Sequence, residues 1–157
     1  MKRALLTLML PFALAACGTT AAGYSGGTAP SSQSAPATIS VGSTSLGQIL
    51  VDANGKTLYL FEADTSTQST CSGACAQAWP PLTTTGTPKA AAGASASLLG
   101  TTTRSDGTTQ VTYSGHPLYY FVGDSKAGDT NGEGSTAFGA GWDVLSAAGA
   151  KIEKSGG

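Results

Sequence analysis

The sequence predicts an all-β domain, a small sandwich or barrel built from two pseudo-symmetric β-hairpin repeats with at most short helical turns. The phrase GKTLYLFEAD at 55–64 returns as GHPLYYFVGD at 115–124, which indicates a duplicated unit. In both copies, β-forming residues flank a tight turn, at Asn54-Gly55 and at Ser114-Gly115. No long segment carries apolar residues at the 3.6-residue period of an amphipathic helix.

Residues 1–16 have the pattern of a secretory signal peptide. Lys2 and Arg3 precede an apolar run from Ala4 to Ala16 that is too short to span a membrane comfortably. The four residues 14–17 read Leu-Ala-Ala-Cys, the form of a bacterial lipobox, in which Cys17 is diacylated and becomes the first mature residue. Two acyl chains suffice for stable anchoring. We therefore expect a membrane partner, reached through a diacylglycerol on Cys17, and a place in the cell envelope.

The residue after the lipobox helps to predict which membrane the lipid anchor enters. Gly18 stands where an inner-membrane retention signal would have Asp. In a host with two membranes, this favours the periplasmic face of the outer membrane or the cell surface.

Residues 17–38 are predicted to be the lipidated cysteine and a flexible tether. From Gly18 to Thr38 the chain has no charge and almost no large apolar side chain, so it cannot offset its ordering entropy. A Gly/Ser-rich coil of this length reaches roughly 25 Å.

A single β domain is predicted over 39–153. It divides into repeat one (39–83), a low-complexity spacer (84–97) and repeat two (98–153). CAQAWPPL in repeat one occupies the place of FGAGWDVL in repeat two, which sets Trp79 against Trp142. We expect helix only around Cys71 to Ala78, ended by the two prolines that follow Trp79.

The strand after the first turn has two apolar faces. Tyr59 and Phe61 point to one side, and Leu58 and Leu60 point to the other. A strand that is apolar on both faces is covered on both. The two hairpins are therefore expected to pack against each other.

The repeated aromatic and acidic residues allow two interpretations. In the first, Tyr59, Phe61, Tyr119 and Phe121 form the core, and Asp64 and Asp124 accept hydrogen bonds from turn amides or a tyrosine hydroxyl. In the second, the two tyrosines line a ligand cleft between the halves. The two carboxylates would then close that cleft around a sugar or a cation.

The pattern Tyr-x-aromatic-x-x-Asp occurs twice, in LYLFEAD and LYYFVGD, beside CSGACAQAWPPL and DGTTQVTYSGHPLYYFVGD. In this it resembles a family of bacterial lipoproteins described as secreted repeats of unknown function. The resemblance covers nearly all of the chain beyond the tether. It implies architecture and export, but no reaction.

Cys71 and Cys75 are the cysteines that remain after lipidation, and in an oxidising compartment a disulfide between them is expected. Residues four apart in a regular helix hold their Cβ atoms too far apart for this bond. The bridge therefore needs a non-helical turn, which Ser72-Gly73 can supply. The alternative is a thiol pair that binds a soft metal such as Cu(I), together with His116.

Asp129, Asn131 and Glu133 alternate in GDTNGEGS, like the start of a calcium loop. The bidentate glutamate expected at the twelfth position falls on Ala140, so a solvated glycine-rich loop is the favoured interpretation.

Charge and residue types narrow the function. The chain has 8 basic and 9 acidic residues, and removal of the signal peptide takes away Lys2 and Arg3. The mature chain is mildly acidic and has no basic stripe, so no nucleic-acid partner is expected.

No catalytic set emerges, and neither an enzyme nor a cofactor is expected. We expect a lipid-anchored envelope protein that acts as a non-catalytic binding or envelope-interaction module, with an envelope protein or a small ligand as partner. The alternative is a periplasmic metal-binding or redox accessory protein that uses Cys71, Cys75 and His116.

Overall fold

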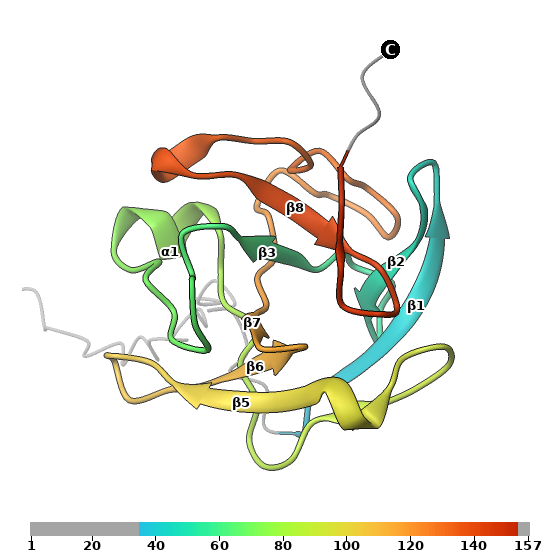
Figure 1. Cartoon of the computed structure of the whole chain (residues 1–157), viewed down its shortest axis with the longest axis horizontal. Helices are drawn as coiled ribbons and strands as arrows, with labels where there is room; N and C mark the ends of the chain where they lie inside the picture. The colour runs from blue at the N-terminus through green and yellow to red at the C-terminus, as the bar shows by residue number, and fades with distance from the viewer. Residues whose placement is uncertain (1–34, 154–157) are drawn as a thin grey trace, which may run out of the picture. The chain divides into compact units, whose positions relative to one another are not determined.

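The computed structural model describes residues 35–153. Its short strands form three small sheets (Figure 1). The strands are β1 (Thr38–Thr44), β2 (Gly47–Asp52), β3 (Tyr59–Phe61), β4 (Lys89–Ala90), β5 (Leu99–Thr103), β6 (Thr109–Tyr113), β7 (His116–Pro117), β8 (Trp142–Leu145) and β9 (Lys151–Ile152). The signal peptide, Cys17 and the predicted tether as far as residue 34 lie outside the described residues.

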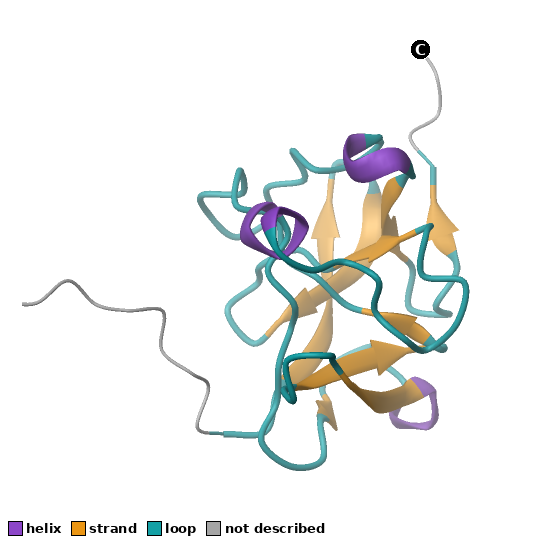
Figure 2. Ribbon diagram, turned by 90° about the vertical axis from the view of Figure 1, so that its left-hand side faces the viewer, coloured by secondary structure: helices purple, strands orange, loops and turns teal. Residues whose placement is uncertain are grey.

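Helix is limited to short turns. These are α1 (Ala74–Ala78) and the 3₁₀ turns η1 (Ala96–Leu98) and η2 (Ala137–Gly139), of which only α1 lies in the segment where helix was expected. Figure 2 shows them as short purple segments at the outside of the strands. Pro80 and Pro81 follow α1 and lack the amide hydrogens that would extend it. Within 35–153, no helix is long and apolar enough to cross a bilayer.

Each repeat opens with an antiparallel hairpin. β1 pairs with β2 from Ile39↔Asp52 to Thr44↔Gly47, and β5 pairs with β6 from Leu99↔Tyr113 to Thr103↔Thr109. The three sheets have the orders β2-β1-β4, β3-β8-β9 and β5-β6-β7. The described chain is thus an all-β sandwich of two repeats, as predicted.

The predicted turn at Asn54-Gly55 is present, but the hairpin around it is short. Asp52 N donates to Lys56 O (2.9 Å), and Leu58 N donates to Leu50 O (3.1 Å). Beyond Leu58 the chain leaves β2, and β3 pairs with β8 instead. Local turn signals predict the reversal of the chain but do not specify how far two strands stay together.

The predicted spacer is part of a sheet. β4 lies within residues 84–97 and pairs in parallel with β1, through Lys89 N to Ala37 O (2.8 Å) and Ala91 N to Ile39 O (2.7 Å). β1 itself begins at Thr38, one residue before the predicted start of the domain. The small residues of the spacer therefore cover an edge of repeat one.

The two repeats are interleaved through the segments that carry the motif. Tyr59 N donates to Tyr119 O, and Tyr119 N donates to Tyr59 O, both at 2.9 Å. On its other edge, β3 pairs with β8 of repeat two (Figure 1). Each edge of β3 is thus covered by the other repeat.

The motif segment of repeat two also lies between two segments of the other repeat. Residues 118–122 run beside 78–82 of repeat one, with Tyr120 N donating to Pro80 O (2.8 Å) and Leu82 N donating to Leu118 O (2.9 Å). The two motif segments are therefore each held between strands of the opposite repeat.

The two faces of these segments bury different side chains, which confirms the prediction from their apolar pattern. One face contributes to a leucine cluster, consisting of Ala37, Ile39, Leu50, Leu58, Leu60, Leu82, Val111, Tyr113, Leu118 and Leu145. The other contributes to an aromatic cluster, consisting of Ile49, Val51, Tyr59, Phe61, Cys71, Cys75, Trp79, Tyr119, Trp142 and Val144.

Candidate functional site

The repeated tyrosines and aspartates form two hydrogen bonds that cross between the repeats. Tyr59 Oη donates to Asp124 Oδ2 (2.7 Å), and Tyr119 Oη donates to Asp64 Oδ2 (2.5 Å). All four side chains are buried. We call these contacts the crossed pairs. The tyrosine of each motif copy thus donates a hydrogen bond to the aspartate of the other copy.

The two carboxylates also organise the loops that follow them. Asp64 Oδ1 accepts from Thr70 N (2.7 Å) and Thr70 Oγ1 (2.6 Å). Asp124 Oδ1 accepts from Asn131 N (2.9 Å) and Asn131 Nδ2 (3.2 Å). Each of these buried carboxyl groups is thus well supplied with hydrogen-bond donors, as buried polar groups require.

The tyrosine hydroxyls are held in their protonated form. Burial raises the pKa of Tyr59 and of Tyr119, and donation to a carboxylate raises it further. Both groups therefore remain hydrogen-bond donors well beyond neutral pH.

Four aromatic rings stack in a row on the same face. The order is Phe61, Trp142, Trp79, Phe121, with successive ring centroids 4.1, 3.9 and 4.4 Å apart. Trp142 comes from the opposite repeat to Phe61, and Trp79 comes from the opposite repeat to Phe121. Such pairs contribute about 0.5–1.5 kcal/mol beyond their buried area. The aromatic row thus also holds the repeats together.

The burial of the two tyrosines bears on the two interpretations of the motif. Tyr59 and Tyr119 are both 0% exposed, so they do not line an open cleft. The reciprocal backbone pairing of the tyrosines brings the halves into direct contact there, which favours the core interpretation for the tyrosines.

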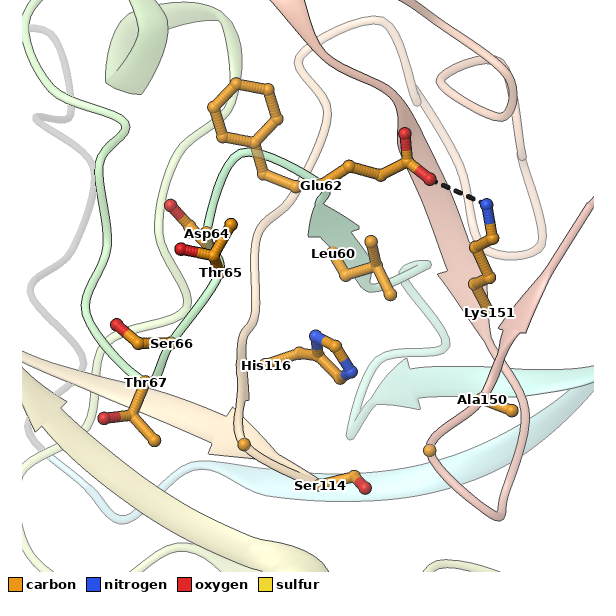
Figure 3. A pocket seen from close by; sticks show the side chains of 13 residues that line it. Leu60, Glu62, Asp64, Thr65, Ser66, Thr67, Ser114, His116, Ala150 and Lys151 are labelled. Atoms are coloured by element: carbon orange, nitrogen blue, oxygen red, sulfur yellow. Dashed lines mark hydrogen bonds and ion pairs between the residues drawn. The ribbon is translucent and has the colours of Figure 1, made fainter.

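A cleft of about 520 Å³ opens elsewhere between the repeats, beside β3 and β7 (Figure 3). Repeat one lines it with residues 60–62 and 64–67, and repeat two lines it with residues 114–116 and 149–151. We call it the open cleft. Its size falls within the usual range for small-molecule sites.

An ion pair forms one wall of the open cleft. Lys151 Nζ lies 2.7 Å from Glu62 Oε1 and 2.7 Å from Glu153 Oε1 (Figure 3). Donation from Lys151 lowers the pKa of Glu62, and the two carboxylates, Glu153 first, raise the pKa of Lys151. Both partners of the Glu62–Lys151 pair are thus charged at neutral pH. Their side chains are partly exposed, at 41% and 42%.

A family model described as a secreted repeat of unknown function matches residues 40–83 and again residues 100–146, which together make up more than half of the chain. The chain belongs to this family of secreted repeats. Comparison with curated proteins and with solved structures gave no significant match.

The disulfide of this secreted repeat is present, as expected. Cys71 and Cys75 are bonded, with their Cα atoms 5.3 Å apart. Gly73, at φ +56°, turns the chain before α1 begins at Ala74, which is the non-helical step that the spacing required. Since the bond uses both sulfur atoms, neither is a thiolate ligand. His116 lines the open cleft, and neither cysteine does.

The three residues of the predicted calcium loop serve separate contacts. Asp129 Oδ2 accepts from Ser125 N, Ser125 Oγ and Lys126 N at 3.0–3.1 Å, and these donors lower its pKa. Asn131 donates to Asp124, and Glu133 Oε2 accepts from Val144 N (2.7 Å). Among residues 35–153, no group of three His, Cys, Asp or Glu side chains is arranged to hold a metal ion.

A buried arginine, which the sequence analysis did not single out, links the disulfide to a crossed pair. Arg104 Nη2 donates to Cys71 O (2.7 Å), and Arg104 Nη1 donates to Ser69 Oγ (2.6 Å) and Gln110 Oε1 (2.8 Å). Ser69 Oγ lies 2.6 Å from Tyr119 Oη. An arginine at a strand end carries no pattern that marks it as buried, so sequence alone does not reveal this network.

Proposed function

We propose that this secreted repeat is a lipid-anchored, non-catalytic binding module of the cell envelope, and that the open cleft is its binding surface. The observation that carries the proposal is the open cleft itself, which residues of both repeats line beside the buried tyrosines. The crossed pairs and the aromatic row join the repeats into one body, and the open cleft lies on that body where the two repeats meet.

A non-catalytic role is supported by the state of the acidic groups near the cleft. Asp64 accepts from Tyr119 and Thr70, and Glu62 is paired with Lys151. A general base must be within reach of the proton that it removes and have a pKa near the working pH. The lowered pKa of Glu62 argues against that role.

Anchoring is supported by the first residues of the chain. Leu14-Ala-Ala-Cys17 ends an apolar run of signal-peptide length, and the segment after it is uncharged, which is the composition of a tether. Gly18 favours delivery to the outer membrane where the host has one. The metal-binding or redox alternative has less support, because its three residues are divided between a disulfide and the cleft.

Metabolic labelling with a palmitate analogue tests the anchor. We expect the wild-type chain to carry the label and to sediment with membranes, and Cys17→Ser to lose both properties because it has no acceptor thiol. The matched control, Cys71→Ala/Cys75→Ala, should be labelled as the wild type is. Label on Cys17→Ser, or unlabelled wild-type protein in the soluble fraction, would contradict the proposal.

A further inference from the structure

We infer that the open cleft binds an uncharged, hydroxyl-rich ligand of the carbohydrate class. The inference rests on the proposed binding role and names the ligand chemistry of the same site. It is carried by a difference between two places that the internal repeat makes equivalent.

At the equivalent place in the other half, the loop of repeat two covers the turn of repeat one. Lys56 Nζ donates to Asp124 O (2.9 Å), Thr57 Oγ1 donates to Asp129 O (2.6 Å), and Gly128 N donates to Gly55 O (3.1 Å). The fit is close, since a Cβ atom added at Gly55 would lie 3.1 Å from Ala127 Cβ.

At the open cleft the corresponding loop, which follows Asp64, does not cover the turn at Gly115. Gln68 Nε2 donates to Thr102 Oγ1 (2.8 Å), and Ser69 is held by Arg104, so the loop after Asp64 follows β5 rather than the turn at Gly115. A Cβ atom added at Gly115 would meet no atom within 4 Å. His116 takes the place of Lys56. The two halves share one architecture, and one half leaves open what the other covers.

The chemistry of the lining also differs between the two places. A hollow of about 400 Å³ remains beside Lys56. Pro80, Phe121 and Val122 are among the residues that line it. In the open cleft, Glu62 takes the place of Val122, and hydroxyl side chains line the wall (Figure 3). The two places thus present different polar groups, hydroxyls and an ion-paired glutamate in the open cleft and Lys56 with Asp52 and Asp124 in the other hollow.

Several polar groups in the open cleft are available to a ligand. The hydroxyls of Thr65, Thr67 and Ser114 and the imidazole of His116 make no side-chain hydrogen bond to any residue within 35–153. Hydroxyls and neutral imidazole both donate and accept, as sugar hydroxyls do. Leu60 and Phe61 line the cleft with little exposed apolar surface, since each is 4% exposed.

The charged groups of the open cleft argue against anionic ligands. Glu62 and Glu153 flank Lys151, so the wall has no excess of positive charge for a phosphate or a carboxylate. The described part of the chain also lacks a three-ligand cluster for a metal ion. An uncharged ligand that exchanges hydrogen bonds with the Glu62–Lys151 pair and the hydroxyls fits best.

Binding of oligosaccharides by the full-length protein in detergent tests the inference. The probes are an array of neutral, sialylated and sulfated oligosaccharides, followed by calorimetric titration with the neutral oligosaccharide that binds best. We expect binding to neutral sugars, and at least a tenfold loss of affinity in Glu62→Gln and in His116→Ala. Val122→Thr, at the position equivalent to Glu62, should bind within twofold of the wild type.

Thermal melting of each variant separates lost binding from lost folding, and Lys151→Ala replaces any variant that does not fold. Absence of binding to neutral sugars at millimolar concentration, preference for anionic sugars, or affinity that the cleft variants leave unchanged would overturn the inference. None of these results touches palmitate labelling, so failure of the sugar inference is distinguishable from failure of the proposed anchored role.

Discussion

Tyr59 and Tyr119 each use both the backbone and the hydroxyl to bind the opposite repeat. Their amide and carbonyl groups pair with each other, and their hydroxyls reach Asp124 and Asp64. The five-residue spacing of the motif places the aspartate beyond the end of the strand, within reach of the other repeat's tyrosine. Residues of identical type at equivalent positions therefore form contacts that join the two halves.

A double-mutant cycle tests the crossed geometry. Tyr59→Phe and Asp124→Asn should each lower the free energy of unfolding by about 1.5–3 kcal/mol, because each removes a hydrogen bond involving a charged group. We expect the pair to be coupled by about 0.5–3 kcal/mol in urea denaturation. The control cycle of Tyr59→Phe with Asp64→Asn, in the same motif copy, should be additive to about 0.5 kcal/mol. Coupling only within one copy would contradict the crossed arrangement.

Among the elements, α1 and the disulfide before it form one unit. Cys71 and Cys75 close a short ring, Gly73 turns the chain inside it, and Trp79 N donates to Cys75 O (2.7 Å) where the helix ends. Five residues of helix are too few to be stable alone. The ring and the burial of Trp79 therefore fix the position of α1.

Removal of the disulfide measures this contribution. Cys71→Ala/Cys75→Ala should lower the free energy of unfolding by about 2 kcal/mol, because closure of a five-residue loop restricts the unfolded chain only modestly. Urea denaturation of the variant and of the wild type, with and without reductant, gives the value. Reductant should not affect the variant, and an unchanged unfolding midpoint in the variant would contradict the expectation.

At the scale of the whole domain, the two repeats behave as the halves of an interleaved pair. β3 lies between two segments of repeat two, and residues 118–122 lie beside two segments of repeat one. Neither half contains the strands that cover the edges of its own motif segment. Folding of one repeat is thus inseparable from folding of the other.

This dependence predicts complementation between fragments. Fragments 35–95 and 96–153 should each be unfolded alone, because each lacks the partner strands for its motif, and they should assemble one-to-one when mixed. Tryptophan fluorescence reports assembly, since Trp79 and Trp142 become buried, and analytical ultracentrifugation gives the stoichiometry. Cooperative thermal unfolding of either fragment by itself would show that the repeats are independent.

Much of the local structure could be predicted from the sequence. The turns at Gly55 and Gly115, the single helical turn before Pro80 and the Cys71–Cys75 bond all depend on residues close together in the chain. The two apolar faces of β3 followed from the alternation of side chains along a strand. Each of these features is encoded by spacing within about twenty residues.

The open cleft could not be predicted in this way. It depends on whether the loop after Asp64 folds over the turn at Gly115 or follows β5, and the contacts of Gln68 and Ser69 with residues more than thirty positions away decide that. The wall that Lys151 forms with Glu62 joins residues 89 positions apart. No spacing rule connects such residues.

By itself, the sequence determined that this protein has two copies of one aromatic β unit, which side chains those units bury, and where a short disulfide ring stands. Only the tertiary structure decided that the copies exchange strands and hydrogen bonds, and that one of two equivalent places stays open. The physical reason is that side-chain periodicity is a local property of the chain, whereas the backbone groups at a strand edge accept any strand that lies alongside. Which strand does so depends on the packing of the entire domain.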